Sequence, residues 1–287
     1  MFQRFYENSL IHKAAGTCDY ERAKINRILR LMNELCLSHT EQIDKSVLNR
    51  VISTLKSKIS NKTINKIVLI FKQAYRFNEI EFDYLQTFSK LKEGKRHFNI
   101  IEERELAKIM NFVITSDSSI GNNILYQSAI TLMLETGVRA NELLHIEIRN
   151  INFHDRSILL TTTKTKKDRY VFFTELSESY IKLMIKTGPK RNELLYNTLK
   201  CRIALARDIK YMIDKLKKEL GITLLHPHMF RHTFATLAHY HNMDLMVLKE
   251  LLGHENLTTT QIYTHISKEG LKSAYSRAFS NVNVHGQ

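Results

Sequence analysis

Cysteine and long apolar runs are scarce in this chain, and each scarcity argues against a class of protein. The three cysteines, Cys18, Cys36 and Cys201, form neither a C-x-x-C pair nor an even set at tight spacing. This argues against a disulfide framework or a cysteine zinc site and fits a reducing compartment. Apolar runs such as Ile67 to Phe71 fall far short of the roughly 18 residues that a membrane helix needs. The N-terminal stretch MFQRFYENSL is polar from its third residue, so we expect no secretory leader and a soluble, cytoplasmic protein.

Acidic residues are also few relative to basic ones. The 287 residues include 43 Lys and Arg against 29 Asp and Glu, a formal net charge of +14. The excess is spread along the chain, which indicates a folded surface that meets a polyanion. Composition alone leaves open a basic protein with no nucleic-acid partner. The length allows one large or two ordinary domains, each with its own core.

Proline is absent from residues 1–92, and apolar residues recur there at helical spacing. This pattern predicts a small helical bundle with basic outer faces. The segment Lys90 to His97 combines a glycine with several positive charges and shows no apolar periodicity. It predicts a basic linker, at residues 93–99, between a domain at 1–92 and a second domain at 100–287. The apolar faces of the first domain are Ile25, Ile28, Leu29 and Met32; Val47, Leu48, Val51, Ile52 and Leu55; and Ile64, Ile67, Val68, Phe71 and Tyr75.

The second domain begins with two predicted helices, the later of which ends at Gly137. A glycine at that place favours a left-handed helix cap. Arg139 follows directly and enters the next helix, in the stretch VRANELL. A fixed cation beside unpaired backbone donors at a helix start suits an anion.

Residues 152–173 change character and predict a β-hairpin. Two β-forming runs, 158–163 and 169–173, flank a charged turn that begins at Lys164. A lysine near the tip of a hairpin can reach into a site built elsewhere. The alternative is that Lys164, Lys166 and Lys167 only make the turn soluble.

Helices return after the hairpin, and a proline marks the start of one of them. Pro227 favours a helix that begins there, which places His228, Arg231 and His232 on one face of its first turns. The two histidines, four residues apart, could be interpreted as a metal site. However, no carboxylate lies between them and Arg231 would repel a dication, so an anion clamp is the preferred interpretation.

The last motif is LLGHENLTTTQIYTH, residues 251–265. A short helix ends at Gly253, His254 follows it, and Tyr263 lies nine residues after His254. Beyond it, residues 271–279 repeat apolar side chains at helical spacing and predict an amphipathic helix at about 268–280. This helix would dock either on its own domain or on a neighbouring subunit.

Four motifs in order, TGVRANELL, TKTKKDRYVFF, HPHMFRHTFAT and LLGHENLTTTQIYTH, give the chain a family resemblance. Over nearly all of residues 100–280 it resembles the tyrosine recombinases, also called the phage integrase family, and in length and layout it looks like their compact Xer-like members. The resemblance implies a mainly α fold. An N-terminal core-binding, SAM-like helical bundle would join a mostly helical catalytic domain with a small three-stranded antiparallel sheet, together forming a C-shaped DNA clamp.

The resemblance also implies a catalytic centre. Tyr263 would attack a DNA phosphate, leaving a 3′-phosphotyrosyl bond and a free 5′-hydroxyl. Arg139 and Arg231 would grip the non-bridging oxygens. Lys164 would protonate the leaving 5′-oxygen.

The remaining implied roles belong to two histidines and a glutamate. His228 would assist proton transfer at the tyrosine, His254 would hydrogen-bond a phosphate oxygen, and Glu142 would orient the site. Where the family often has glycine beside the hairpin lysine and proline in the next strand, this chain has Thr165 and Phe172. Lys164 stays preferred over Lys166 and Lys167.

As a whole, the resemblance implies site-specific strand exchange through a Holliday junction, for resolution or for integration and excision of DNA elements. A homotetramer would act on two duplexes and exchange C-terminal helices, without metal, ATP or another cofactor. Two alternatives stay open. A catalytically silent DNA-binding relative is disfavoured by the intact set of site residues, and a type IB topoisomerase by the terminal helix and the Xer-like length.

Overall fold

The computed structural model describes residues 2–13, 15–34, 45–80, 83–93, 99–161 and 168–253. Contacts divide the chain into two compact units, Met1–Arg96 and His97–Gln287, and each has its own apolar core. The described residues are mostly helical, with a three-stranded antiparallel sheet, which confirms the predicted fold class. Among the described helices, none combines the length and the apolarity needed to traverse a bilayer.

The first unit is a helical bundle around helix α4. One face of α4 buries Ile64, Ile67 and Phe71, and the helix packs against α1, α2, α3 and α5. Ser60 caps its start, since the hydroxyl accepts a hydrogen bond from the Thr63 backbone N–H. Lys62 and Lys66 lie exposed on the opposite face, as the periodicity predicts. The helices are α1 (Phe2–His12), α2 (Ala15–Glu34), α3 (Lys45–Lys56), α4 (Asn61–Phe77) and α5 (Asp83–Thr87).

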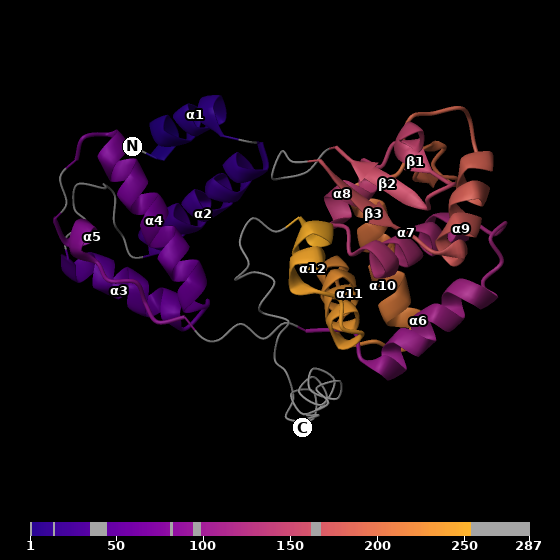
Figure 1. The fold of residues 1–287 in the computed structure, drawn as a ribbon. Coiled ribbons are helices and arrows are strands. Elements are labelled where there is room, and N and C mark those ends of the chain that lie inside the picture. Colours follow the sequence, from indigo (N-terminus) through magenta and orange to yellow (C-terminus); the bar gives the residue numbers. More distant parts are fainter. Residues whose placement is uncertain are drawn as a thin grey trace, which may run out of the picture. The chain divides into compact units, whose positions relative to one another are not determined.

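The second unit is built around helix α7 (Asn123–Thr136). This helix is apolar on nearly every side and is buried almost throughout, as a helix without a polar face must be. It packs against α6 (Glu103–Thr115), α9 (Glu175–Lys186), α10 (Ala206–Leu220), α11 (Pro227–Tyr240) and strand β3 (Figure 1). The remaining elements are α8 (Ala140–Leu144), η2 (Ile148–Asn150), β1 (Ile151–Asn152), β2 (Ser157–Leu160), β3 (Arg169–Phe172), β4 (Tyr196–Asn197), β5 (Arg202–Ile203) and α12 (Leu245–Leu252).

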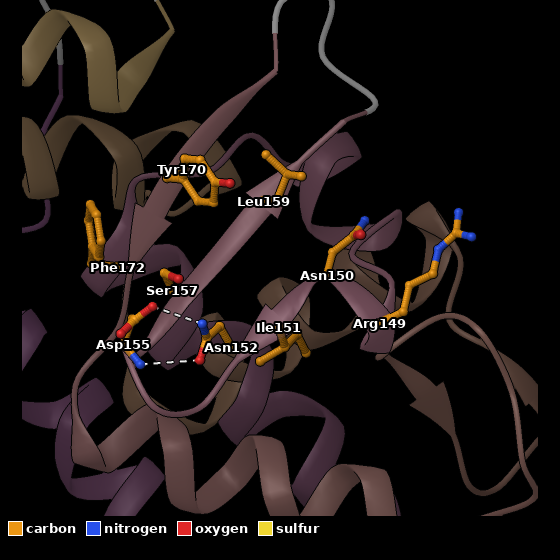
Figure 2. A pocket seen from close by; sticks show the side chains of 9 residues that line it. All are labelled: Arg149, Asn150, Ile151, Asn152, Asp155, Ser157, Leu159, Tyr170 and Phe172. Carbon is orange, nitrogen blue, oxygen red and sulfur yellow. Dashed lines mark hydrogen bonds between the residues drawn. The ribbon is translucent and has the colours of Figure 1, made fainter.

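The three-stranded sheet has the order β1-β2-β3, and both pairings are antiparallel. Its register pairs Ser157 with Phe172 and Leu160 with Arg169. Along β3 the side chains alternate, with Arg169 buried and Tyr170 and Phe172 exposed. Figure 2 shows the two aromatic rings on the outer face of the sheet, where they help line an open pocket together with β1 and the turn between β1 and β2. The tip of the hairpin, residues 162–167, lies outside the described residues.

The small pair of strands β4 and β5 was not predicted. Each strand has two residues, too few for the alternation that marks a strand in a sequence. The pair is held by Asp208, at the start of α10. Its carboxylate accepts hydrogen bonds from the Arg202 guanidinium at 2.8 and 3.0 Å and from the Asn197 amide at 2.8 Å.

Glycine ends helix α7 as predicted, in the left-handed conformation. Gly137 has φ 62°, and a Cβ built there would lie 2.4 Å from Cδ1 of Phe234 and 3.0 Å from Cδ2 of Leu252. Both the backbone conformation and the close approach of α11 and α12 therefore require a residue without a side chain.

Helices α11 and α12 form a small core of their own beside α7. Ala235 of α11 packs against Leu248 and Leu252 of α12. Asp244 caps α12, because its carboxylate accepts hydrogen bonds from the backbone N–H groups of Met246 and Val247. Helix α12 also contacts β3. Its C-terminal end is thereby fixed between α11, α7 and the sheet.

Candidate active site at the end of helix α12

Three arginines from distant parts of the sequence meet the last carbonyl groups of α12. Arg169 Nε donates to the carbonyl of Leu251 at 2.9 Å, and Arg231 Nη2 donates to that of Leu252 at 2.6 Å. Arg139 Nη2 reaches the carbonyl of the helix cap, Gly253, at 3.3 Å. The last carbonyls of a helix lack partners within the helix and form its negative pole. The negative pole of α12 therefore binds the guanidinium groups of all three arginines.

Glu142, on α8, links two of these arginines. Its Oε1 accepts from Arg139 Nη1 at 2.7 Å and from Arg169 Nη1 at 3.1 Å, and its Oε2 accepts from Arg169 Nη2 at 2.7 Å. The side chain is buried. Burial acts to raise the pKa of this carboxyl, but hydrogen bonds and charge from Arg169 and Arg139 outweigh it and lower the pKa to about 2. Glu142 is therefore ionised wherever the protein works near neutral pH.

The backbone beside Arg139 differs from the sequence expectation. We expected unpaired backbone donors there, ready for an anion. Instead the Arg139 N–H donates to Glu142 Oε2 at 2.9 Å at the start of α8, the one bond of a capping box that a glutamate at this place supplies. The cationic side chain of Arg139, 23% exposed, is what remains available to an anion at this turn.

Arg231 is the most enclosed of the residues predicted to grip a phosphate. Helix α11 begins with Pro227 at its first position, so Arg231 falls on the second turn and points into the unit. Its Nη1 donates to the Gly137 carbonyl at 2.7 Å, its Nη2 donates to the Leu252 carbonyl, and its exposed fraction is 3%. The guanidinium thus ties the turn after α7 to the end of α12.

Two histidines of α11, His228 and His232, are uncharged near neutral pH. The imidazoles of His228 and His232 lie 6.4 Å apart between ring centroids. Partial burial, then the charges of Arg231, His226 and Arg139, lower the pKa of His228. Burial, followed by His228, Arg231 and His226, lowers the pKa of His232 to about 4. In the part of the chain that the structure describes, no group of three or more His, Cys, Asp or Glu side chains could hold a metal ion.

The described residues bring together four of the predicted site residues, Arg139, Glu142, His228 and Arg231. The other three, Lys164, His254 and Tyr263, lie outside the described residues. In the sequence, His254 directly follows Gly253, the residue whose carbonyl Arg139 contacts.

Arg169 was missed as a site residue, because the sequence reading treated it only as the start of a β-strand. A signal was present in the strand RYVF. Period-two alternation puts Arg169 in phase with the buried Val171. A buried arginine needs hydrogen-bond acceptors that compensate its charge, and a carboxylate does so best. Glu142 is a carboxylate beside another predicted site residue.

Comparisons with known proteins identify one family. The model of the Phage integrase family matches residues 99–270, more than half of the chain. A probable integrase/recombinase of Acholeplasma phage L2 is 29% identical over 271 residues, 93% of each protein. Tyrosine recombinase XerC of Bacillus subtilis is 31% identical over 230 residues, 76% of this chain and 74% of the relative. Among solved structures, the Tn1549 transposon integrase in complex with transposon right end DNA superposes with a TM-score of 0.74 at 18% identity, over 95% of this chain and 98% of that one.

The chain belongs to the phage integrase family. It is a tyrosine recombinase, an enzyme that transfers DNA strands in site-specific recombination. The structural likeness, at 18% identity, shows the shared fold.

Proposed function

We propose that this recombinase cleaves and rejoins double-stranded DNA at specific core sites through a 3′-phosphotyrosyl intermediate, with Tyr263 as the nucleophile. The observation that carries the proposal is the convergence of Arg139 and Arg231 on the end of α12, at Leu252 and Gly253. From this point the sequence continues into His254 and Tyr263. The Tn1549 integrase, which has this fold, was solved with DNA, and this supports duplex DNA as the ligand.

The two arginines would stabilise the charge that develops on the phosphate. A guanidinium stays protonated throughout the reaction and offers N–H groups in a planar fork that matches phosphate oxygens. Arg139 is partly exposed and would meet the DNA directly, whereas Arg231 is buried. A fixed cation in a site shielded from water stabilises the transition state more than the same cation in water.

Two proton transfers complete the cleavage step. The phenol oxygen of Tyr263 bonds to phosphorus, and its proton passes to His228, whose lowered pKa keeps the imidazole neutral and able to accept it. The bond from phosphorus to the 5′-oxygen breaks, and Lys164 protonates that oxygen. His254 would donate a hydrogen bond to a phosphate oxygen. The covalent intermediate conserves the energy of the bond, so no ATP, metal or other cofactor is part of the proposal.

The domain assignment belongs to the same proposal. Residues 1–92 would bind DNA through basic faces such as that of Lys62 and Lys66, residues 93–99 would connect, and residues 100–287 would catalyse. Exposed lysines at a DNA surface release counterions from the phosphates. Strand exchange would proceed through a Holliday junction in a homotetramer on two duplexes, for resolution or for integration and excision of DNA elements.

Tyr263→Phe tests the proposal, with a pool of random-sequence duplexes, each carrying a nick that traps a cleaved strand. We expect the unaltered protein to form an adduct that survives detergent, and sequencing of the trapped DNA to identify the site. Because phenylalanine lacks the phenol oxygen, Tyr263→Phe should bind the recovered site but form no adduct. The matched control is Tyr240→Phe, at an exposed tyrosine that ends α11, which should keep the adduct.

Three outcomes would contradict the proposal. An adduct with Tyr263→Phe would move the nucleophile to another residue. Binding without an adduct in the unaltered protein would indicate a catalytically silent relative. Relaxation of supercoiled DNA that lacks paired sites, with no strand exchange, would indicate a topoisomerase.

A further inference from the structure

We propose that Arg169 is a positioning residue for the nucleophile. It holds the C-terminal end of α12 against the pair of Glu142 and Arg139, and so fixes the position and direction of Gly253, from which the sequence continues towards Tyr263. This inference rests on the proposed function of Tyr263.

Arg169 bridges two different parts of the site with one side chain. Its Nε donates to the Leu251 carbonyl at 2.9 Å, while its Nη1 and Nη2 donate to Glu142 at 3.1 and 2.7 Å. It reaches them from the first residue of β3, where strand alternation turns the side chain inward. Helix α12 is thereby joined through Arg169 to the sheet and to α8.

These contacts close a ring of hydrogen bonds. Arg169 binds Glu142, Glu142 binds Arg139, and Arg139 Nη2 donates to the Gly253 carbonyl. The backbone from Gly253 back to Leu251 then returns to Arg169. A ring of this kind fixes the direction as well as the position of a helix end, because each donor restrains a different carbonyl.

Glycine at position 253 is part of the same arrangement. Gly253 has φ 61°, and a Cβ built on it would lie 3.0 Å from Nη1 and 3.1 Å from Cδ and Cζ of Arg169. The guanidinium therefore packs directly against the last backbone turn before His254. A larger residue would need both the left-handed backbone and a displaced arginine.

Burial assigns different tasks to Arg169 and Arg139. The Arg169 side chain is 3% exposed and its three nitrogens already have protein partners, whereas the Arg139 side chain is 23% exposed. Arg139 is thus the one of the two that can contact a phosphate. Arg169 acts through Glu142 and the backbone of α12.

Arg169→Lys separates positioning from phosphate binding. Lysine keeps the positive charge beside Glu142, but a single ammonium cannot replace a fork that spans Glu142 and the Leu251 carbonyl together. We expect tyrosine-dependent cleavage of the nicked duplex to slow by about 10²-fold, the effect of a misplacement of about 1 Å. DNA affinity should change little, and a melting curve checks that the variant is folded.

A second reaction measures the phosphate site without the tyrosine. In the Tyr263→Phe background, the probe is a duplex with a 3′-(4-nitrophenyl phosphate) end and an adjacent 5′-hydroxyl. The 5′-oxygen bonds to phosphorus, 4-nitrophenolate leaves, and the hydroxyl proton passes to solvent. We expect Arg169→Lys to leave the rate of this reaction nearly unchanged.

Two variants serve as controls. Arg156→Lys makes the same substitution at an arginine whose ion pairs with Glu175 and Glu178 lie away from α12, and it should preserve both reactions. If Arg169→Lys does not fold, Gly253→Ala gives the second test, because it displaces the end of α12 while Arg169 and Glu142 both remain. It should slow cleavage by a larger factor than the nitrophenyl reaction, which it affects only through Arg139 and His254 beside Gly253.

The outcomes distinguish this inference from the proposed function. Equal losses in both reactions would place Arg169 in the phosphate site or in the stability of the fold, and no loss in either would mean that it positions nothing. Either result overturns the inference while adduct formation by the unaltered protein still supports Tyr263. If the unaltered protein forms no adduct, both proposals fail together.

Discussion

At Glu142, a single buried carboxylate accepts four hydrogen bonds from two arginines. Loss of one partner of a buried ion pair leaves the other charge without compensation, which costs about 3–5 kcal/mol. Here one carboxylate compensates both Arg139 and Arg169. The stability of the site should therefore depend on the ionisation of this group.

Glu142→Gln should lower the free energy of unfolding of the second unit at pH 7 by roughly 3 kcal/mol, the value that corresponds to the lowered pKa of Glu142. The pKa of about 2 in the fold lies below the ordinary value of 4.5 for a glutamate carboxyl group. The contribution is therefore complete above pH 4.5 and is lost as the pH falls from 4.5 towards 2. The difference between the two proteins should shrink over that same interval.

Hydrogen exchange of the α7 amides across a urea series measures this energy, because it reports the unfolding of the second unit alone. Glu103→Gln is the control, since Glu103 is exposed on the first turn of α6, and its effect should be small at every pH. A difference for Glu142→Gln that stays constant from pH 7 to pH 2 would contradict the ion-pair account.

Individual site residues differ in how far the sequence reveals them. Arg139, Arg231 and His228 stand in motifs, so their type and spacing were enough to single them out. Arg169 could not be identified in that way. Its importance comes from contacts with residues 27 and 82 positions away in the chain, and local alternation predicts only that it points inward.

Among the secondary-structure elements, the ends of α7 and α10 give a matched comparison. Both helices stop at a glycine in the left-handed conformation, Gly137 at φ 62° and Gly221 at φ 65°. A Cβ at Gly221 would meet nothing within 4 Å, whereas one at Gly137 would lie 2.4 Å from a Phe234 ring carbon. Both glycines adopt the left-handed backbone conformation, but of the two only Gly137 is closely packed against other side chains.

Gly221→Ala should destabilise the protein by about 1 kcal/mol, the cost of a left-handed alanine. Gly137→Ala should cost a further 1–3 kcal/mol or so, because the added methyl overpacks the junction of α7, α11 and α12. Hydrogen exchange of the α7 amides across a urea series measures the loss of unfolding free energy for both substitutions. Equal effects of the two substitutions would show that the junction relaxes around the methyl group.

The elements also separate into predictable and unpredictable kinds for a physical reason. Helices α10, α11 and α12 have both apolar periodicity and an end signal, such as Pro227 or Gly253. Helix α7 is a long, mainly apolar segment that ends at Gly137. Strands β4 and β5 are too short to show a period. They are held together by side-chain hydrogen bonds of Asp208 with Asn197 and Arg202.

For the molecule as a whole, the sequence indicates which faces are buried but not which faces meet. The bonds that join Arg139 and Arg169 to carbonyl groups at the end of α12 span 114 and 82 residues of chain. Apolar periodicity carries no information at that range. The convergence on α12 therefore emerges only in the folded unit.

Removal of residues 268–287 tests the assembly that we propose for the whole molecule. The apolar repeat at 271–279 would dock on a neighbouring subunit, so the shortened protein should bind a single recovered site normally but assemble poorly on paired sites. Gel-shift titrations on one and on two sites measure the two steps. Unchanged assembly on paired sites would place the C-terminal segment on its own subunit.

The hairpin of β2 and β3 consists of a paired part, whose register must be kept, and a connection between Leu160 and Arg169, whose length can vary. The β2–β3 register, which runs from Ser157–Phe172 to Leu160–Arg169, sets the direction of the Arg169 side chain. It does so whatever the number of residues that connect Leu160 to Arg169. An insertion between Arg169 and Phe172 would instead turn every later side chain to the opposite face. Variation among natural or engineered versions of this enzyme should therefore accumulate at residues 161–168 other than Lys164, where the tip can change without any change in the direction of Arg169.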